Sequence, residues 1–200
     1  MSHDLYLVRH GQTLFNRKQM ISGWTDSPLT ELGVEQARRA GEFLRHRGLV
    51  FDHAHVSTLT RTHATLRAVM PGIPFEEHDG LREWYFGEYE AERMSIMPAR
   101  PWGEYFVPFG GEAQMEVRAR VVDTLTQIME RETVDPVLAV SHGSAIREFH
   151  DAVVTDSEEA KRGVPGNAAT LHFTFEDGVF ALKEIFTQED YAAELGIEPL

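Results

Sequence analysis

The stretch PVLAVSHGSAIREF, residues 136–149, holds the best-defined strand-to-helix transition in the chain. Residues 137–140 are apolar at every position, which predicts a strand buried on both faces, as in a parallel sheet. A Ser-His-Gly tripeptide follows at residues 141–143, and a helix is expected over residues 144–154. This segment therefore places one histidine, His142, at the carboxyl end of a buried strand.

The N-terminal segment LYLVRHG, residues 5–11, has the same form, because an apolar strand ends there at Arg9 and His10. A weaker strand is expected over residues 51–56, and Arg61 follows it. In parallel sheets, ligands bind beside the carboxyl ends of the strands. Three segments that lie far apart in the sequence are therefore expected to bring two arginines and two histidines to one edge of a sheet.

Strands and helices alternate along most of the chain, which predicts an α/β fold, a three-layer α/β/α sandwich with a mostly parallel central sheet. The other expected elements are a helix capped by Thr30 and ended by Gly48, a helix over residues 62–70, a short strand over 73–77, a helix over 112–132 whose apolar stripe holds Met115, Val122, Leu125 and Met129, and a hairpin over 170–186 that turns at Asp177 and Gly178. The acidic segment 188–200 is expected to be a solvated terminus.

Residues 78–111 interrupt this alternation, with many aromatic side chains among glycines and prolines. Long connections without regular structure are usually functional or disordered, and a high aromatic content argues against disorder. We therefore expect an aromatic-rich insert or lid over the site, within a single domain that spans residues 1–200.

The composition excludes several classes of protein. The 200 residues include no cysteine, which rules out disulfides, a Cys-based zinc site and a thiolate nucleophile. A formal net charge of −13 disfavours binding to nucleic acid or to an anionic membrane, so any phosphate must be held by a local group of donors. The N-terminus has no signal-peptide pattern and no apolar run is long enough to span a membrane, so a cytoplasmic protein is expected, either a monomer or a homodimer.

The arginines and histidines at the predicted edge suit a compact dianion, most simply a phosphoryl group, because guanidinium donors match phosphate oxygens. A histidine nucleophile must be unprotonated, and neighbouring arginines lower its pKa. The leaving oxygen of a phosphoester needs a proton donor. Glu83, at the start of the aromatic insert, is the best-placed carboxyl group, although Glu88 and Glu90 lie close to it in the sequence.

Five motifs together resemble the histidine phosphatase superfamily, in the branch that includes cofactor-dependent phosphoglycerate mutase. They are VRHGQTLFN at residues 8–16, SGWTDSPLTELGVEQA at 22–37, STLTRT at 57–62, LREWYFGEYE at 81–90 and VSHGSAIR at 140–147. The resemblance covers the chain from Leu5 to about Asn167. It implies a phosphoglycerate mutase-like fold.

The resemblance also implies a role for each matching position. His10 looks like the nucleophile that becomes phosphohistidine, and Glu83 looks like the proton donor that later activates water. The implied phosphate pocket and substrate loop consist of Arg9, Arg61 and His142, with Asn16 as an additional donor and with Ser22 and Gly23 beside the substrate. The implied reaction is a metal-independent hydrolysis of a small phosphorylated metabolite, with no cofactor, in which arginines supply the positive charge.

Two other functions stay open. A cofactor-dependent mutase would use the same phosphohistidine, but mutases of this kind are longer and carry a basic insert, whereas residues 91–111 offer only Arg93 and Arg100. A hydrolase is therefore favoured. A non-catalytic module that binds a phosphorylated ligand would be expected to lack the nucleophile or the acid, and this sequence has both.

A second pair of histidines, His53 and His55, lies two residues apart on one face of an expected strand. The two side chains could share a metal ion, but the sequence shows no third ligand. Exposure at the surface is therefore favoured, and no metal site is predicted.

Overall fold

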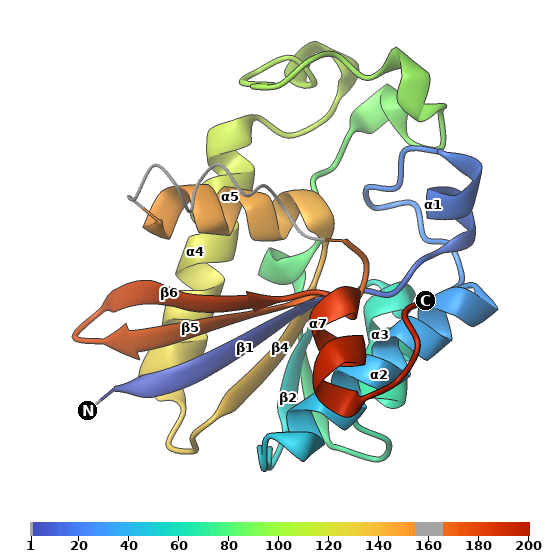
Figure 1. The fold of residues 1–200 in the computed structure, drawn as a ribbon. Helices are drawn as coiled ribbons and strands as arrows, with labels where there is room; N and C mark the ends of the chain where they lie inside the picture. The colour runs from blue at the N-terminus through green and yellow to red at the C-terminus, as the bar shows by residue number, and fades with distance from the viewer. Residues whose placement is uncertain (1, 155–165) are drawn as a thin grey trace.

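The computed structural model describes residues 2–154 and 166–200. Within these residues one six-stranded sheet runs through the molecule, in the order β3-β2-β4-β1-β5-β6 (Figure 1). The strands are β1 (His3–Arg9), β2 (Ala54–Ser57), β3 (Phe75–His78), β4 (Val137–Ser141), β5 (Thr170–Glu176) and β6 (Val179–Phe186). The first four are parallel to one another, and β5 and β6 form an antiparallel hairpin at one edge.

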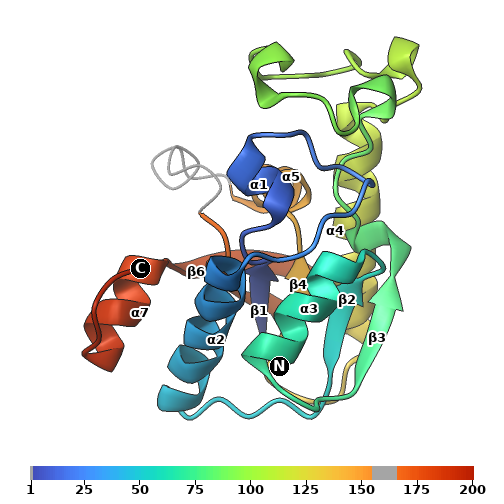
Figure 2. The same ribbon diagram turned by 90° about the vertical axis from the view of Figure 1, so that its right-hand side faces the viewer.

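Helices cover both faces of the sheet (Figures 1 and 2). One face carries α2 (Glu31–His46), α3 (Thr60–Val69) and α7 (Gln188–Leu195), and the other carries α4 (Gln114–Arg131) and α5 (Gly143–Val153). A short helix, α1 (Leu14–Lys18), follows β1. The three-layer α/β/α sandwich with a mostly parallel sheet is therefore confirmed.

The alternation of side chains along the central strands builds the two halves of the core. On β1, Leu5 and Leu7 point to the layer of α4 and α5, whereas Tyr6 and Val8 point to the layer of α2, α3 and α7. Both sets are buried, which explains why the strand has no polar face. Each fully buried leucine contributes roughly 1.5–3 kcal/mol relative to an exposed one, so the central strands anchor the sheet.

Local signals set the position of α2 and of the loop after β1. The Thr30 hydroxyl accepts a hydrogen bond from the backbone N–H of Gly33 at 3.0 Å, and Gly48, with φ of 74°, follows the last turn, as predicted. A Cβ atom at Gly11 would lie 2.2 Å from the carbonyl oxygen of Gly33. The loop that carries His10 therefore packs directly on the backbone of α2.

The apolar stripe of α4 differs from the expected one. Met115 is 64% exposed, and the side chains that enter the core are Val117, Val121, Leu125, Ile128 and Met129, with Val122 partly buried. The helix begins at Gln114, so Met115 lies in its first turn. The expected stripe is confirmed at Leu125 and Met129, with Val122 partly buried beside them, and is wrong only at Met115.

The expectation of a solvated terminus over residues 188–200 is also wrong for the helical part of that segment. Residues Gln188–Leu195 form α7, and the Tyr191 side chain is completely buried beside Phe43 and Phe186. Its hydroxyl lies 2.9 Å from the Ala168 carbonyl oxygen and 2.8 Å from the Thr170 hydroxyl. The acidic composition concealed a short helix that a single aromatic side chain fixes to the core.

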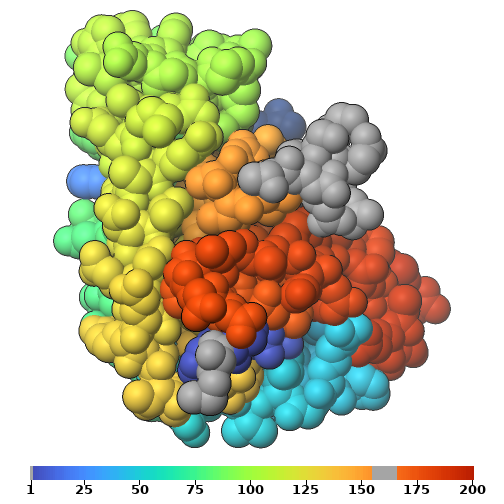
Figure 3. Space-filling view, turned by 90° about the vertical axis from the view of Figure 1, so that its left-hand side faces the viewer, coloured from blue at the N-terminus to red at the C-terminus, as the bar shows by residue number. Residues whose placement is uncertain are grey.

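Residues 78–111 form loops and short 3-10 helices that stand above α4 and α5 (Figure 1). Figure 3 shows the side of the molecule on which α4 runs from this insert, in green, down past α5 and the hairpin. Trp84 and Phe106 of the insert are completely buried, and Phe86 and Trp102 pack against them. These aromatic side chains belong to the same cluster as the core beneath α4 and α5, so they anchor the insert to the domain. No helix of the described residues is long and apolar enough to cross a membrane.

The contact of α7 gives a test of the fold. Changing Tyr191→Phe removes the hydroxyl and leaves the Ala168 carbonyl and the Thr170 hydroxyl without this partner, so we expect a loss of about 1–2 kcal/mol in the free energy of unfolding. Urea unfolding followed by circular dichroism measures it. An unchanged midpoint and slope would contradict the anchoring role of this side chain.

Candidate active site

The predicted residues come together at the carboxyl edge of the parallel strands. Arg9 ends β1 and His10 follows it, His142 follows β4, and Arg61 lies in the first turn of α3, after β2. The ring centroids of His10 and His142 are 5.3 Å apart. Glu83 lies two residues beyond a 3-10 helix, η1 (Asp79–Leu81), and is 6% exposed.

The hydrogen bonds of His10 fix which ring nitrogen can react. Nδ1 lies 2.8 Å from the carbonyl oxygen of Gly11. Since a carbonyl oxygen only accepts, Nδ1 must carry a hydrogen and donate it. In the neutral ring Nε2 then holds the lone pair, so the backbone of the following residue prepares Nε2 as a nucleophile.

The surroundings of His10 keep the ring neutral. Burial lowers the pKa of His10 well below 6.5, and the positive charges of Arg61 and Arg9 lower it further. The same causes, burial first and then Arg61, lower the pKa of His142. Arg61 is buried and Arg9 is partly buried at the cavity wall, and this loss of hydration lowers the pKa of each guanidinium because it disfavours the charged form. The site therefore combines neutral imidazoles with positive charge that an anion would stabilise.

Arg61 and His142 form a connected pair behind His10. The Nε of Arg61 donates to Nδ1 of His142 at 3.1 Å, so Nε2 of His142 carries the hydrogen and donates to the Ser57 hydroxyl at 2.8 Å. The remaining donors of Arg61 bond the Asp26 carboxylate at 3.0 Å and the Gly23 carbonyl oxygen at 2.6 Å. In this arrangement the pair acts on His10 through charge and position.

Glu83 is held at the N-terminus of α5. Its Oε2 accepts a hydrogen bond from the backbone N–H of Ser144, and Oε1 accepts from Ala145 and Trp84, each at 2.9 Å. The positive end of the helix dipole favours a carboxylate at this position. Helix α5, which begins directly after His142, therefore orients the carboxyl group of Glu83, although the two segments lie far apart in the sequence.

The neighbouring carboxyl groups have other tasks. Glu88 is exposed, and Glu90 accepts hydrogen bonds from four backbone N–H groups, those of Gly23, Trp24, Thr25 and Phe86. Glu90 thus ties the loop of Ser22 and Gly23 to the insert. A Cβ atom at Gly23 would lie 2.0 Å from the Glu90 carboxylate, which explains the glycine.

Asn16 is oriented by a residue that the sequence analysis missed. Its Oδ1 accepts hydrogen bonds from the Thr13 backbone N–H at 3.0 Å and from Nδ2 of Asn167 at 3.1 Å. Nδ2 of Asn16 is therefore the atom that could donate to a phosphoryl oxygen. Asn167 also donates to the carbonyl oxygen of His10 at 3.1 Å, but it follows no strand and carries no motif that would reveal it.

Arg120 is a second missed residue. From α4 it donates to the carbonyl oxygens of Gly80, Arg82 and Glu83, and it forms an ion pair with Glu112 at 2.7 Å. It therefore fixes the backbone that carries Glu83. An arginine in the middle of a charged helix gives no signal in a sequence, since it resembles a solvated one.

A cavity of about 300 Å³ opens beside these groups. Of the predicted residues Arg9, His10, Asn16, Ser22 and Glu83 line it, whereas Arg61, His142 and Gly23 do not. The other lining residues are Met20, Ile21, Phe86, Met94, Met97, Arg100, Trp102, Gly143, Ser144 and Arg147. The cavity thus has a basic end near His10 and an apolar wall from the insert.

The expectation for the second histidine pair is wrong in two respects. His55 is completely buried, and a third side chain that could bind a metal, Glu132, lies within 3.2 Å of both His53 and His55. The sequence could not show this because 77 positions separate Glu132 from His55, and only the packing of α4 on the sheet brings them together.

Comparison with known proteins decides the family. The model of the histidine phosphatase superfamily (branch 1) matches residues 5–188. The chain belongs to this superfamily. A histidine phosphatase-family relative from Rhizobium rhizogenes, a 2,3-bisphosphoglycerate-dependent phosphoglycerate mutase, is 35% identical over 166 residues, which cover 74% of this chain and 78% of the relative. In structure, a mycobacterial glucosyl-3-phosphoglycerate phosphatase is similar with a TM-score of 0.76, 25% identity and coverage of 90% and 97%.

The length of the chain does not separate hydrolases from mutases in this family. A 2,3-bisphosphoglycerate-dependent phosphoglycerate mutase from Brucella ovis is 31% identical over 208 residues, which cover 94% of this chain and 100% of the relative. The expectation that such mutases are longer is therefore wrong for this relative. Chain length therefore does not distinguish a phosphatase from a mutase here.

The neutral state of His10 can be measured directly. In an NMR titration of the ¹⁵N-labelled ring we expect a midpoint below 6.5, since burial and the arginines disfavour the charged form, and nitrogen shifts of the Nδ1–H tautomer. The sign follows because a depressed pKa means that protonation needs a lower pH. A midpoint above 6.5, or the Nε2–H tautomer, would contradict the arrangement.

Proposed function

We propose that this histidine phosphatase-family protein is a phosphatase, which hydrolyses a small phosphomonoester through a phosphohistidine on His10. The observation that carries the proposal is the hydrogen bond of His10 Nδ1 to the Gly11 carbonyl oxygen, which leaves the lone pair on Nε2 beside the positive charges of Arg9 and Arg61. This arrangement makes Nε2 the nucleophile of the proposed displacement.

In the first step Nε2 of His10 attacks the phosphorus atom, and the N–P bond forms as the P–O bond to the alcohol breaks. The departing oxygen takes the electron pair and receives a proton from the carboxyl group of Glu83, which lines the same cavity. We assign the role of proton donor to Glu83 because its side chain lines the cavity together with His10, whereas Glu88 and Glu90 do not line it.

In the second step a water molecule attacks the phosphohistidine. The Glu83 carboxylate takes a proton from the water, the N–P bond breaks, and its electron pair returns to Nε2. Inorganic phosphate leaves and His10 is neutral again. The carboxyl group that lost a proton in the first step regains one in the second.

Positive charge at the phosphoryl group comes from Arg9 at the cavity wall, with Arg61 behind it, in keeping with the metal-independent reaction that the resemblance implies. Asn16 contributes an amide donor. We propose Arg61 and His142 as further phosphate ligands. A direct contact requires Arg61 to exchange a bond to Asp26 or to the Gly23 carbonyl, and requires His142 to exchange its bond to the Ser57 hydroxyl. Ser22 and Gly23 border the substrate, with Ser22 on the cavity wall.

The cavity suggests the class of substrate. Its apolar wall, which includes Phe86, Met97 and Trp102, would pack against an apolar part of the alcohol, and Arg100 and Arg147 would pair with a second acidic group. Residues 78–111 supply this wall and so serve as the lid of a single domain. The similar mycobacterial structure is named a glucosyl-3-phosphoglycerate phosphatase, and a phosphoglycerate carries a carboxylate as well as a phosphate, which fits a substrate with two acidic groups.

The mutase reaction is the second candidate, since curated relatives carry that name. It shares the phosphohistidine and returns the phosphoryl group to another hydroxyl. Of the two arginines in residues 91–111 only Arg100 lines the cavity, beside Arg147 of α5, whereas Arg93 lies on a different hollow. Arg100 and Arg147 can pair with a carboxylate or with a second phosphate, so the release of inorganic phosphate without the bisphosphate is what separates hydrolysis from the mutase reaction.

The proposal is tested by phosphate release from a panel of phosphomonoesters, including 3-phosphoglycerate with and without 2,3-bisphosphoglycerate. His10→Ala should lower kcat by at least about 1000-fold, because the nucleophile is lost. Glu83→Gln should lower it by about 100-fold or more for poor leaving groups, since proton transfer contributes 10²–10⁴-fold. His46→Ala, at an exposed position of α2, is the control and should match the native enzyme.

Three results would contradict the proposal. Isomerisation of 3-phosphoglycerate that needs the bisphosphate and releases little phosphate would assign a mutase. Tight binding of phosphomonoesters without turnover would assign a binding module. Full activity of His10→Ala would exclude the phosphohistidine altogether.

A further inference from the structure

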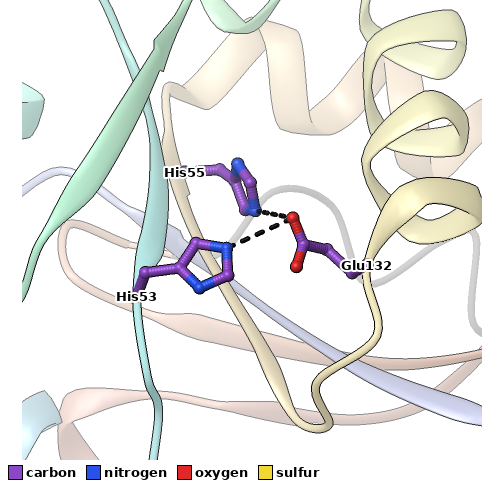
Figure 4. A group of neighbouring side chains, drawn as sticks. All are labelled: His53, His55 and Glu132. Atoms are coloured by element: carbon purple, nitrogen blue, oxygen red, sulfur yellow. Dashed lines mark ion pairs between the residues drawn. The ribbon is translucent and has the colours of Figure 1, made fainter.

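A cluster of two histidines and a glutamate lies between the start of β2 and the C-terminal end of α4, apart from the proposed active site. His53 immediately precedes β2, His55 lies within it, and Glu132 caps the C-terminal end of α4. Figure 4 shows the two imidazoles from the strand and the carboxylate from the helix turned toward one another. From this arrangement we propose that His53, His55 and Glu132 bind a divalent transition metal ion, with Zn²⁺ as the best match.

The distances fit the coordination sphere of zinc. Nε2 of His53 and Nε2 of His55 each lie 3.2 Å from the same oxygen of Glu132, and the three ligand atoms lie within 4.8 Å of one another. Two ligands bound at about 2.0–2.1 Å in a tetrahedral site are about 3.4 Å apart. An ion can therefore enter between these three atoms with small movements of the side chains, and a fourth position is left for water.

The state of His55 points to a ligand. Its ring is completely buried, and its Nε2 makes no hydrogen bond although it faces the Glu132 carboxylate. A buried polar atom without a hydrogen bond is costly, and a metal ion would satisfy both the nitrogen and the oxygen.

A second hydrogen bond orients the ring of His55. Its Nδ1 lies 3.0 Å from Nε2 of His78 on β3. Ligand histidines usually donate a hydrogen from the other ring nitrogen to a nearby acceptor, which fixes the tautomer. Here donation from His55 Nδ1 to His78 leaves Nε2 of His55 as the ligand atom. His78 is therefore a positioning residue for the site.

The position of Glu132 also favours a cation. A helix ends with partial negative charge, so a carboxylate at this end is unfavourable unless a positive charge balances it. The nearest guanidinium, that of Arg131, is 4.0 Å from Glu132 but 2.8 Å from Glu76. The Arg131 guanidinium therefore pairs with Glu76, and Glu132, with a side chain that is 11% exposed, faces the two imidazole rings.

A competing set of ligands shares one of these histidines. His55, His78 and Glu76 also lie close enough to bind an ion. In this set, however, the ion would have to replace the hydrogen bond between the two histidines, and Glu76 is half exposed, paired with Arg131 and 3.9 Å from His78. The set that includes Glu132 needs none of these contacts to break.

Zinc titration of the full-length, tag-free protein, stripped with EDTA and followed by calorimetry, tests the proposal. We expect one saturable Zn²⁺ per chain, and we expect Glu132→Gln and His53→Ala each to weaken the affinity by at least about 10-fold. Glu130→Gln, on the same turn of α4 but exposed, is the matched control, and Glu76→Gln tests the competing set. Both should bind zinc within about twofold of the native protein.

Circular dichroism of each variant establishes that it is folded, and the visible spectrum of bound Co²⁺ reports whether the ligands are tetrahedral. His53 is partly exposed, so its change to alanine is the variant that disturbs the core least. The proposal is overturned if no saturable site exists, if Glu132→Gln and Glu130→Gln bind alike, or if only Glu76→Gln loses zinc. If no saturable site exists, the contact between His55 and Glu132 is an ordinary polar contact.

Discussion

The site depends on positive charge that the fold keeps inside the protein. Arg61 is buried and Arg9 is partly buried at the carboxyl edge of the sheet, where burial of the rings, followed by the charges of these arginines, lowers the pKa of His10 and of His142. The cost of burying a guanidinium is met by specific partners, as the bonds of Arg61 to Asp26, Gly23 and His142 show. A phosphoryl group would add its own negative charge to this balance. The positions of Arg9 and Arg61 would therefore favour the binding of a dianion such as a phosphoryl group.

Backbone contacts then turn a basic pocket into a reactive one. A single carbonyl oxygen selects the tautomer of His10, and three backbone N–H groups hold the carboxylate of Glu83. Two of those N–H groups belong to the first turn of α5, which directly follows His142. The proposed nucleophile and the proposed proton donor are thus positioned by backbone contacts, and the insert adds the apolar wall that would meet the rest of a substrate.

The sequence predicted those parts of the structure that depend on local pattern. The buried strands, the helix cap at Thr30, the hairpin and the edge of the sheet that carries Arg9, His10, Arg61 and His142 all follow from apolar periodicity and turn residues. Contacts between distant segments gave no such signal. Arg120 under Glu83, Asn167 beside Asn16, Tyr191 in the core and Glu132 beside His55 each look like ordinary surface residues until the helices pack.

The central claim is that the phosphoryl group passes through His10. The most direct measurement mixes the enzyme with excess phosphomonoester, quenches it in alkali after milliseconds, and locates the phosphate by mass spectrometry. We expect an acid-labile, alkali-stable phosphate on His10, which is absent in His10→Ala. With an ester whose leaving group needs no proton, such as 4-nitrophenyl phosphate, we expect it to accumulate in Glu83→Gln because only the attack of water is slowed. Phosphate on another side chain, or turnover of substrate without any phosphohistidine, would contradict it.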